Sequence, residues 1–530
     1  MRAFGTELLG SSAQQRLAFA RWWGWFGLTV ALTVAILAII MVSGPNPASV
    51  AWLLYFVGMI LILIRPRMGI YLVVLLTLAA DNILLPAYPF IKNFTSSESL
   101  FHVPNSSLIF SPLETYLVLT VFSWLGRAIY GRAAIGQWRL NLRGGPLLGP
   151  VIFFTLFILL GLGWGLARGG DSNIALWEVR PILYLPLMFA LTTNLIRTRV
   201  QVNRAIWLAM AGLFMVALIG IATWMSAPRA VDGRVEWVIE HGTAVRLNTV
   251  FVLMVAAFVY RASRAKRIVL PLMALFTLYT YVISQRRAAI LALALAFGLM
   301  LILLAQQNRR IFWRVAPPVA LLSVSYLAAF WNRAGPLGLP ARAVRSVFRS
   351  SSGNWLEDAS TFYRLIENIN ISHTLRQAPL TGVGFGHPFH IIVPMPDISF
   401  FEWWQYIPHN SIIWIWIKTG VFGFFAMAFL IGAAIVRSVR VLRDIPESAV
   451  SGWRDLSAIA LTAALYVVMH FTYAYVDMAW DMQSMIYMGL MIGLINSLPW
   501  IAGRRAAAPS TPSPAPFGSA SGAGDSGGRP

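Results

Sequence analysis

Residues 288–305 read AAILALALAFGLMLILLA, an apolar stretch that contains no charged side chain. A helix that crosses the hydrocarbon core of a membrane needs roughly 20 mostly apolar residues, whereas a membrane-spanning β-strand alternates apolar and polar residues. The stretch therefore predicts a transmembrane helix. Similar stretches recur from about Trp22 to Trp500. The predicted fold class is all-α, a polytopic bundle of transmembrane helices.

The composition argues against a soluble protein of this length. Of the 530 residues, 58% are hydrophobic and only 12% are charged, whereas soluble domains carry about 25% charged residues. The net charge of +21 would also suit a nucleic-acid-binding protein, but in a membrane protein Arg and Lys chiefly fix the orientation of the helices. We therefore expect the lipid bilayer, and not nucleic acid, as a partner. The absence of Cys excludes disulfides and Cys-based metal sites.

The positive charges predict about fourteen spans, with both chain ends in the cytoplasm. Cytoplasmic loops of membrane proteins are enriched in Arg and Lys, and every second loop is basic here, from Arg65 and Arg67 to Arg504 and Arg505. The first span is too long for the core of a cleavable signal peptide and is interpreted as a signal anchor. The predicted spans are 22–43, 49–64, 68–86, 110–126, 149–167, 179–196, 205–225, 247–260, 268–285, 288–306, 312–331, 411–436, 456–476 and 482–502.

These spans divide the chain into five segments. Three of the segments contain no transmembrane helix: a short N-terminal segment, one long periplasmic loop, and a tail rich in Pro, Ala, Ser and Gly that cannot bury enough apolar surface to fold. The segments are a cytoplasmic N-terminal segment at 1–21, transmembrane helices 1–11 at 22–331, the periplasmic loop at 332–410, transmembrane helices 12–14 at 411–502, and a disordered cytoplasmic tail at 503–530.

Several arginines lie on the predicted outer side, where the topology rule does not require them. Two of them, Arg286 and Arg287, are adjacent in the tight turn between two spans, where unmatched guanidinium groups cost free energy. Arginine matches phosphate oxygens with a planar, permanently charged fork, so the cluster predicts an anion site, most simply for a pyrophosphate. Alternatively, these side chains extend to lipid headgroups or pair with carboxylates. The other outer arginines are Arg168, Arg180, Arg229, Arg234, Arg246, Arg364 and Arg376.

The long loop is predicted to contain an amphipathic helix over 361–375. Phe362, Leu365, Ile366 and Ile369 recur at helical spacing, and Arg364 lies off that stripe. The glycine-rich stretch GVGFG at 382–386 follows. Because no strand precedes it and no helix is evident after it, we interpret it as a flexible turn rather than a nucleotide motif.

An aromatic segment at 400–410 leads into the next span. Trp403 and Trp404 suit an interfacial aromatic belt, and their rings could also pack against sugar rings. His409 stands at the mouth of the helix beside outer arginines, where an imidazole can accept a proton near neutral pH.

His409-Asn410, followed after nine residues by Gly420-Val421-Phe422-Gly423, resembles the signature of the O-antigen ligase and O-antigen polymerase family. The Arg turn between the ninth and tenth spans, the Arg-led loop helix and the glycine stretch before the His are similar to that family as well. The resemblance covers about residues 270–430. One departure is that the family typically has Ser-Arg-Gly at the turn, whereas this chain has Arg286-Arg287-Ala288. We favour Arg287 as the aligned residue.

The resemblance implies a GT-C-like bundle that transfers a glycan from a polyprenyl (undecaprenyl) pyrophosphate carrier to an acceptor sugar hydroxyl at the periplasmic face, without a metal or another cofactor. We expect an inverting displacement in which His409 and Arg287 are catalytic. The remaining residues predicted to bind substrate are Arg180, Arg246, Arg286, Arg364, Asn410, Trp403 and Trp404.

The acceptor is not fixed by the sequence. We lean toward a polymerase of O-antigen or exopolysaccharide, which joins lipid-linked repeat units; the alternative is an O-antigen ligase, which attaches the finished chain to lipid A-core. A flippase or another transporter would need polar and charged residues near the bilayer midplane, where they line a path. The unusual charges of this chain gather at the outer boundary instead, and only Lys418 and Glu114 have no assigned role. A mannosyl- or oligosaccharyl-transferase needs an acidic first outer loop, which is short and uncharged here.

Overall fold

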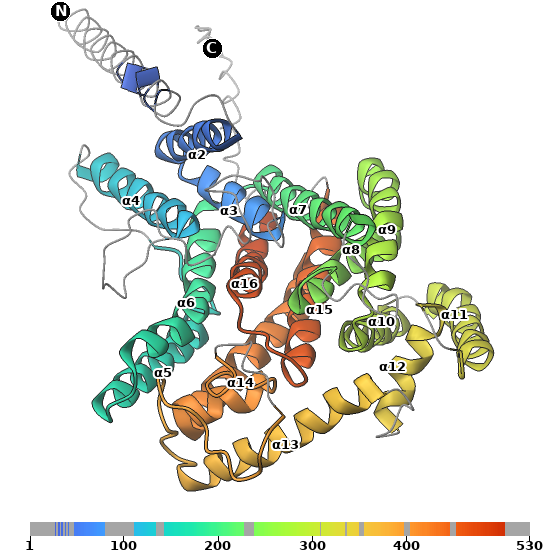
Figure 1. The fold of residues 1–530 in the computed structure, drawn as a ribbon. Helices are drawn as coiled ribbons and strands as arrows, with labels where there is room; N and C mark the ends of the chain where they lie inside the picture. Colours follow the sequence, from blue (N-terminus) through green and yellow to red (C-terminus); the bar gives the residue numbers. More distant parts are fainter. Residues whose placement is uncertain are drawn as a thin grey trace, which may run out of the picture.

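The computed structural model describes residues 47–79, 111–133, 142–226, 238–307, 309–333, 336–348, 355–396, 403–445 and 452–503, with scattered positions between 27 and 41. Within these ranges the regular elements are α-helices and one short 3₁₀ helix, without a strand (Figure 1). The predicted all-α fold is confirmed. The elements are α2 (Pro47–Ile64), α3 (Arg67–Ala79), α4 (Pro112–Ala133), α5 (Leu148–Ala167), α6 (Ser172–Leu195), α7 (Arg199–Ser226), α8 (His241–Val259), α9 (Arg264–Ser284), α10 (Arg287–Gln307), α11 (Arg309–Phe330), η1 (Pro336–Gly338), α12 (Leu339–Phe348), α13 (Trp355–Gln377), α14 (Ser411–Asp444), α15 (Trp453–Ala474) and α16 (Met482–Gly503).

Ten of the described helices, α5 to α11 and α14 to α16, are long and apolar enough to cross a membrane. The chain is therefore a multi-pass membrane protein. The other four predicted spans are not among these ten. The first lies mostly outside the described residues, the second and third correspond to the shorter apolar helices α2 and α3, and the fourth corresponds to α4.

The centre of the bundle is formed by α8, α15 and α16, with α6 packed along α16. In the apolar window of α16, 89% of the residues are buried, against 0% in α11, so α16 is enclosed by protein and α11 is a peripheral helix. Two glycines at a four-residue spacing allow the close packing of α16 on α6: a Cβ at Gly489 would lie 2.6 Å from the carbonyl oxygen of Leu185, and one at Gly493 would lie 2.7 Å from Thr192 Cβ. Small residues at this spacing let membrane helices approach closely.

Several helices begin earlier than the apolar pattern predicts, most clearly α6, α7 and α8, of which α7 begins at Arg199 and not at the predicted 205. The predicted start of a span at 179 is wrong, since α6 begins at Ser172 and Asp171 caps it by accepting hydrogen bonds from the main-chain N–H groups of Asn173 and Ile174. The predicted start at 247 is wrong as well, since α8 begins at His241. A hydropathy window detects only the apolar part of a helix. Arg180 and Arg246 therefore lie within helices and not at their mouths.

The elements of the long loop gather at one end of the bundle. We call the end where α6, α8 and α14 begin and α9 ends the outer end, because the charge pattern predicts that it faces the periplasm. There α13 packs against α14 and crosses below it in the view of Figure 1. The predicted loop helix is present, and it is longer than the predicted 361–375.

The glycine-rich stretch is packed tightly against α5 and α14. Gly382, Gly384 and Gly386 have φ angles of 69°, 88° and 81°, a region that side chains other than Gly rarely occupy. Between them, Val383 donates a main-chain hydrogen bond to the carbonyl oxygen of Ile417 at 2.7 Å, and Phe385 is completely buried. The flexible turn expected from the sequence is a fixed corner of the structure.

Gly384→Ala is expected to destabilise the folded protein by about 2 kcal/mol or more, because it combines a left-handed backbone with a steric overlap. A Cβ at this position would lie 2.4 Å from Gly165 Cα. The thermal midpoint of the detergent-solubilised variant measures the loss. Gly169→Ala is the matched control, since Gly169 has a φ of +83° but a Cβ added there would have no heavy atom within 4 Å. Equal midpoints for the two variants would show that the overlap at Gly384 contributes nothing.

Candidate functional site

The helix α13 buries polar residues and exposes apolar ones. Glu367 and Asn370 are buried, whereas Phe362, Leu365 and Ile369 are 57%, 59% and 43% exposed. These three form the predicted apolar stripe, while its fourth predicted member, Ile366, lies on the buried side. The buried face is tied to the rest of the loop by its amides and carboxylates, so this face, and not the apolar one, anchors the helix.

Glu367 holds His409 from across the loop. The imidazole Nδ1 lies 3.1 and 3.2 Å from the two carboxylate oxygens, and the main-chain N–H of His409 donates to Oε2 at 3.0 Å. Glu367 is almost fully buried, and the His409 side chain is 19% exposed. Because an ionised carboxylate only accepts hydrogen bonds, Nδ1 is assigned as a protonated nitrogen, and in the neutral ring Nε2 carries the lone pair. His409 is therefore oriented to accept a proton at Nε2.

Tyr363 closes one side of the His409 ring. The two ring centroids are 5.5 Å apart with an interplanar angle of 73°, an edge-to-face contact. Burial and the nearby Glu367 carboxylate raise the pKa of the Tyr363 phenol above its ordinary value. The phenol therefore stays neutral and leaves the negative charge beside His409 to Glu367.

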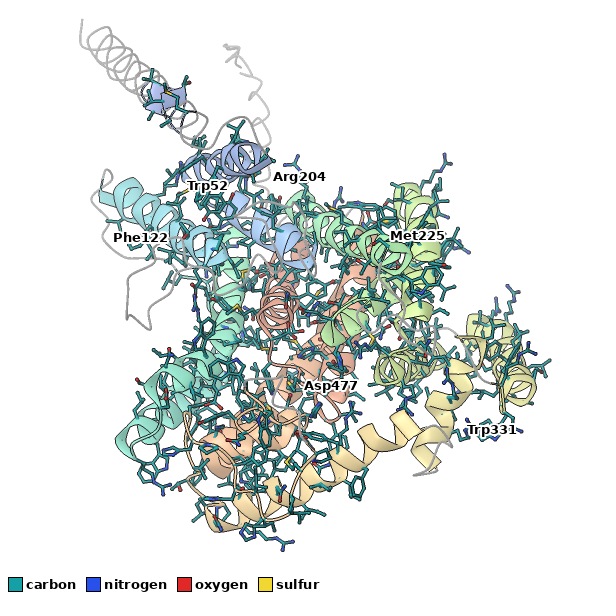
Figure 2. All side chains as sticks on the ribbon, viewed as in Figure 1. Trp52, Phe122, Arg204, Met225, Trp331 and Asp477 are labelled. Carbon is teal, nitrogen blue, oxygen red and sulfur yellow. The ribbon has the colours of Figure 1, made fainter. Side chains whose placement is uncertain are left out.

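Asp477, in the loop between α15 and α16, connects α13 with α8. One of its carboxylate oxygens lies 3.7 Å from Arg364 Nη2 and 2.9 Å from His241 Nδ1. Figure 2 labels this residue, which lies in the interior between α13 and the C-terminal helices. Burial opposes the charge of Asp477, but the hydrogen bond from His241 and the positive charge of Arg364 outweigh it and hold the pKa of Asp477 well below its ordinary value.

His241 also contacts the arginine turn. Its Nε2 lies 2.7 Å from Nη1 of Arg286. Arg287, the first residue of α10, stands next to Arg286. Arg286, His241, Asp477 and Arg364 therefore form a continuous polar chain across four segments of the outer end.

A second arginine–carboxylate pair lies beside this chain. Arg246, only 2% exposed on α8, donates to Asp481 Oδ1 at 3.0 Å and to Ser484 Oγ at 2.8 Å. The structure thus brings together four predicted residues: Arg246, Arg364 and His409 contact Asp481, Asp477 and Glu367, and Arg286 contacts His241. We call these residues with Glu367, His241, Asp477 and Asp481 the outer polar cluster.

The start of α14 is fastened to the same loop between α15 and α16. Asn410 caps α14, since its side chain accepts a hydrogen bond from the main-chain N–H of Ile413 at 3.1 Å. Ser411 Oγ donates to the carbonyl oxygen of Asp477 at 2.9 Å and accepts from the N–H of Ala479 at 2.9 Å. These contacts fix the distance between His409 and Asp477. The described contact of Asn410 is a structural one.

Arg180 forms a pair of its own on α6. It donates to both carboxylate oxygens of Glu114, and Tyr184 Oη donates to Glu114 Oε1 at 2.6 Å. Glu114 is also part of the capping box of α4, because it accepts from the N–H of Ser111 at 2.9 Å. Glu114, which had no predicted role, is thus a partner of Arg180. The described contacts of this pair do not join it to the outer polar cluster.

The two predicted tryptophans lie in a turn before His409. The Trp403 ring centroid is 6.4 Å from that of Trp177 on α6, and both Trp403 and Trp404 are half-buried. Their rings thus line the approach from α6 to the start of α14.

A buried ion pair lies next to the glycine-rich stretch. Lys418 Nζ is 2.7 Å from Glu178 Oε1, and both side chains have 1% exposure or less. Glu178 also accepts from the N–H of Gly386 at 2.7 Å, and Lys418 donates to the carbonyl oxygen of His387. Lys418, the second residue without a predicted role, therefore anchors the stretch to α6 and α14.

Sequence reasoning did not identify Glu367, His241, Asp477 or Asp481 as site residues. Glu367 and His409 are 42 residues apart, and His241 and Asp477 are 236 apart, so no local pattern joins them. One signal was available: Asp477 and Asp481 are carboxylates between two predicted spans on the outer side, where the unexplained arginines also lie.

The outer polar cluster combines a proton acceptor with anion-binding donors. His409 offers a lone pair at Nε2, and the guanidinium groups of Arg286 and Arg364 carry permanent charge. The side chains of His241 and Arg364 are 40% and 34% exposed, so the cluster is open to a ligand. Among the residues that the structure describes, no group of three or more His, Asp or Glu side chains is arranged to hold a metal ion.

For a reaction in which His409 accepts a proton, Glu367→Gln is expected to lower kcat at least roughly tenfold with little change in KM, because the amide no longer enforces the Nδ1–H tautomer of His409. Initial rates of the purified protein at varied substrate concentration separate kcat from KM. Asn368→Ala, at the exposed neighbouring position, is the control. A rate for Glu367→Gln equal to that of the control would remove Glu367 from the mechanism.

Residues 272–428 match the family model described as O-Antigen ligase. No curated protein matches the chain. The matched segment runs from α9 to the first half of α14 and contains Arg286, Arg287, Arg364 and His409. The match supports the predicted resemblance to the O-antigen ligase family over this segment, which lies within the predicted 270–430.

Proposed function

We propose that this chain, which carries a domain of the O-antigen ligase family, is a glycosyltransferase of the bacterial inner membrane with both termini in the cytoplasm. It transfers a glycan from a polyprenyl pyrophosphate carrier to a sugar hydroxyl at the periplasmic face, in the polymerisation of a surface polysaccharide. The observation that carries the proposal is the outer polar cluster, in which the His409–Glu367 pair lies beside arginines at one end of a membrane bundle.

The proposed step is an inverting displacement. His409 Nε2 accepts the proton of the acceptor hydroxyl, and the hydroxyl oxygen forms a bond to the anomeric carbon from the face opposite the leaving group. The bond between that carbon and the pyrophosphate oxygen breaks, and its electron pair leaves with the pyrophosphate. Fixed cationic donors stabilise such developing negative charge, the role assigned to Arg286, Arg287 and Arg364. No metal or other cofactor has a role in this step.

The remaining predicted residues have supporting roles. Arg246 is held by Asp481 and Arg180 by Glu114, so we assign these two arginines to positioning α8 and α6 around the donor. Trp403 and Trp404 offer ring faces to the sugars. Asn410 keeps His409 in place through the cap of α14.

An O-antigen ligase that attaches the finished glycan to lipid A-core is the second candidate, and the description of the matched family model favours it. A flippase has less support. The two charges that suited a transport path, Lys418 and Glu114, are neutralised by Glu178 and Arg180, so they do not line a polar route through the bundle.

The test is the surface polysaccharide of a deletion strain that carries either the wild-type gene or a His409→Ala variant. Gels report chain length on the acceptor, and extracted carrier lipid reports what remains on polyprenyl pyrophosphate. Single repeat units on the acceptor, with long chains lost, support the polymerase. Long chains on the carrier, with a bare acceptor, support the ligase. A wild-type profile in the deletion strain would reject both.

A further inference from the structure

His241, the first residue of α8, lies between a carboxylate and a guanidinium. Its Nδ1 is 2.9 Å from Asp477 Oδ2, and its Nε2 is 2.7 Å from Arg286 Nη1. Its side chain is 40% exposed, whereas that of Asp477 is 8% exposed. The imidazole is thus fixed on its buried side and accessible on the other.

These two contacts determine the protonation of the ring. An ionised carboxylate only accepts and a guanidinium only donates. Nδ1 must therefore carry the proton that Asp477 accepts, and Nε2 must offer its lone pair to Arg286. Without a ligand, His241 is a neutral imidazole. It becomes a cation only if Arg286 turns away from Nε2.

We infer that His241 is a further ligand of the diphosphate group, and that it takes up a proton when a diphosphate draws Arg286 away from Nε2. This inference rests on the proposed function. The proton comes from the solvent or buffer and forms the Nε2–H bond, and Nε2–H then donates to a phosphate oxygen while Nδ1–H still donates to Asp477. No other covalent bond changes. The protein thereby gains a positive charge where the negative charge of the ligand arrives.

The neighbouring charges explain why a histidine suits this position. Arg364 and Arg246 are already engaged by Asp477 and Asp481, which offset part of their charge. His241 adds a positive charge without breaking a carboxylate contact. His409 is not available for this purpose, since Nε2 of that ring must remain unprotonated to accept the hydroxyl proton.

Ionisable groups from several elements surround His241 and influence its protonation. They are Glu240 just before α8, Arg246 on α8, Arg286 and Arg287 at the turn between α9 and α10, Arg364 on α13, His409 before α14, Tyr473 on α15, and Asp477 and Asp481 between α15 and α16.

The test is calorimetric titration of inorganic pyrophosphate into the full-length protein in phosphatidylcholine nanodiscs, in two non-phosphate buffers with different heats of ionisation. Subtracting the result for His241→Gln from that for the wild type cancels the proton changes of pyrophosphate itself. The difference is expected to approach about one proton taken up near neutral pH. The variant is expected to bind roughly tenfold more weakly.

Arg286→Gln provides a second variant if His241→Gln does not fold. Without the guanidinium at Nε2, His241 can be protonated before the ligand binds, so proton uptake is expected to fall here as well. Arg310→Gln, on exposed α11, is the control and should retain the wild-type uptake. Wild-type uptake in every folded variant at positions 241 and 286 overturns the inference.

The lipid arm distinguishes a diphosphate from a membrane headgroup. Nanodiscs that contain phosphatidylglycerol should give the same uptake on addition of pyrophosphate. Loss of uptake in these nanodiscs would mean that the headgroup already occupies the position, and would overturn the assignment. Glycan transfer is measured separately. If proton uptake is unchanged in the variants but transfer depends on His409, the inference alone is rejected. If uptake depends on His241 but transfer does not depend on His409, the proposed function alone is rejected.

Discussion

His409→Ala is expected to lower the rate of glycan transfer by roughly 10²- to 10⁴-fold, the range lost when a positioned general base is removed. His409 is partly exposed before α14 and contacts Glu367 and Tyr363, so its removal takes away the proton acceptor without opening the membrane core. The rate is measured with purified protein and a polyprenyl-pyrophosphate-linked donor, and the amount of folded protein is measured in parallel.

His373→Ala is the matched control. His373 lies on α13 at the same end of the protein and contacts Gln377 at 2.9 Å, away from the Glu367–His409 contact. It should retain the wild-type rate. Arg287→Ala tests the stabilisation of the leaving pyrophosphate and should also lose transfer. Normal transfer in both His409→Ala and Arg287→Ala, at wild-type protein levels, would contradict the proposed roles.

The fold was largely predictable because the membrane imposes it. In a bilayer, an apolar stretch such as 288–305 forms a helix, because a helix makes all its main-chain hydrogen bonds internally. The structure has α10 there. The starts of α6 and α8 were missed because Asp171 and His241 belong to polar first turns that an apolar pattern does not detect. The structure in the long loop was only partly predictable: α13 has helical spacing, whereas the corner at Gly384 depends on contacts with Gly165 far away in the chain.

The candidate site was predicted as isolated residues and not as pairs. An unexplained Arg or His can be recognised from the topology, as Arg286 and His409 were. Its partner cannot, because contacts between Glu367 and His409 or between His241 and Asp477 arise from helix packing over long chain separations. Arg180 shows the consequence: its charge alone predicts an anion site, whereas the structure pairs it with Glu114.

Glu178→Ala is expected to destabilise the folded protein by about 3–5 kcal/mol, because it leaves the Lys418 ammonium buried without its carboxylate. Both side chains are inaccessible, and the pair also holds Gly386 and His387. Lys418→Ala is expected to have a similar effect by stranding Glu178. The yield of monodisperse protein after detergent extraction, and its thermal midpoint, measure the loss.

The double variant Glu178→Gln/Lys418→Gln separates charge compensation from packing. Two amides keep an acceptor for the N–H of Gly386 and a donor for the carbonyl oxygen of His387, and they leave no buried charge. The double variant is therefore expected to be more stable than either alanine variant, since replacing a whole buried ion pair costs far less than breaking it. Arg376→Gln, at the exposed end of α13, controls for loss of an outer charge. If the double variant were less stable than both single variants, the charges themselves would be stabilising, and the pair would be more than an anchor for the glycine-rich corner.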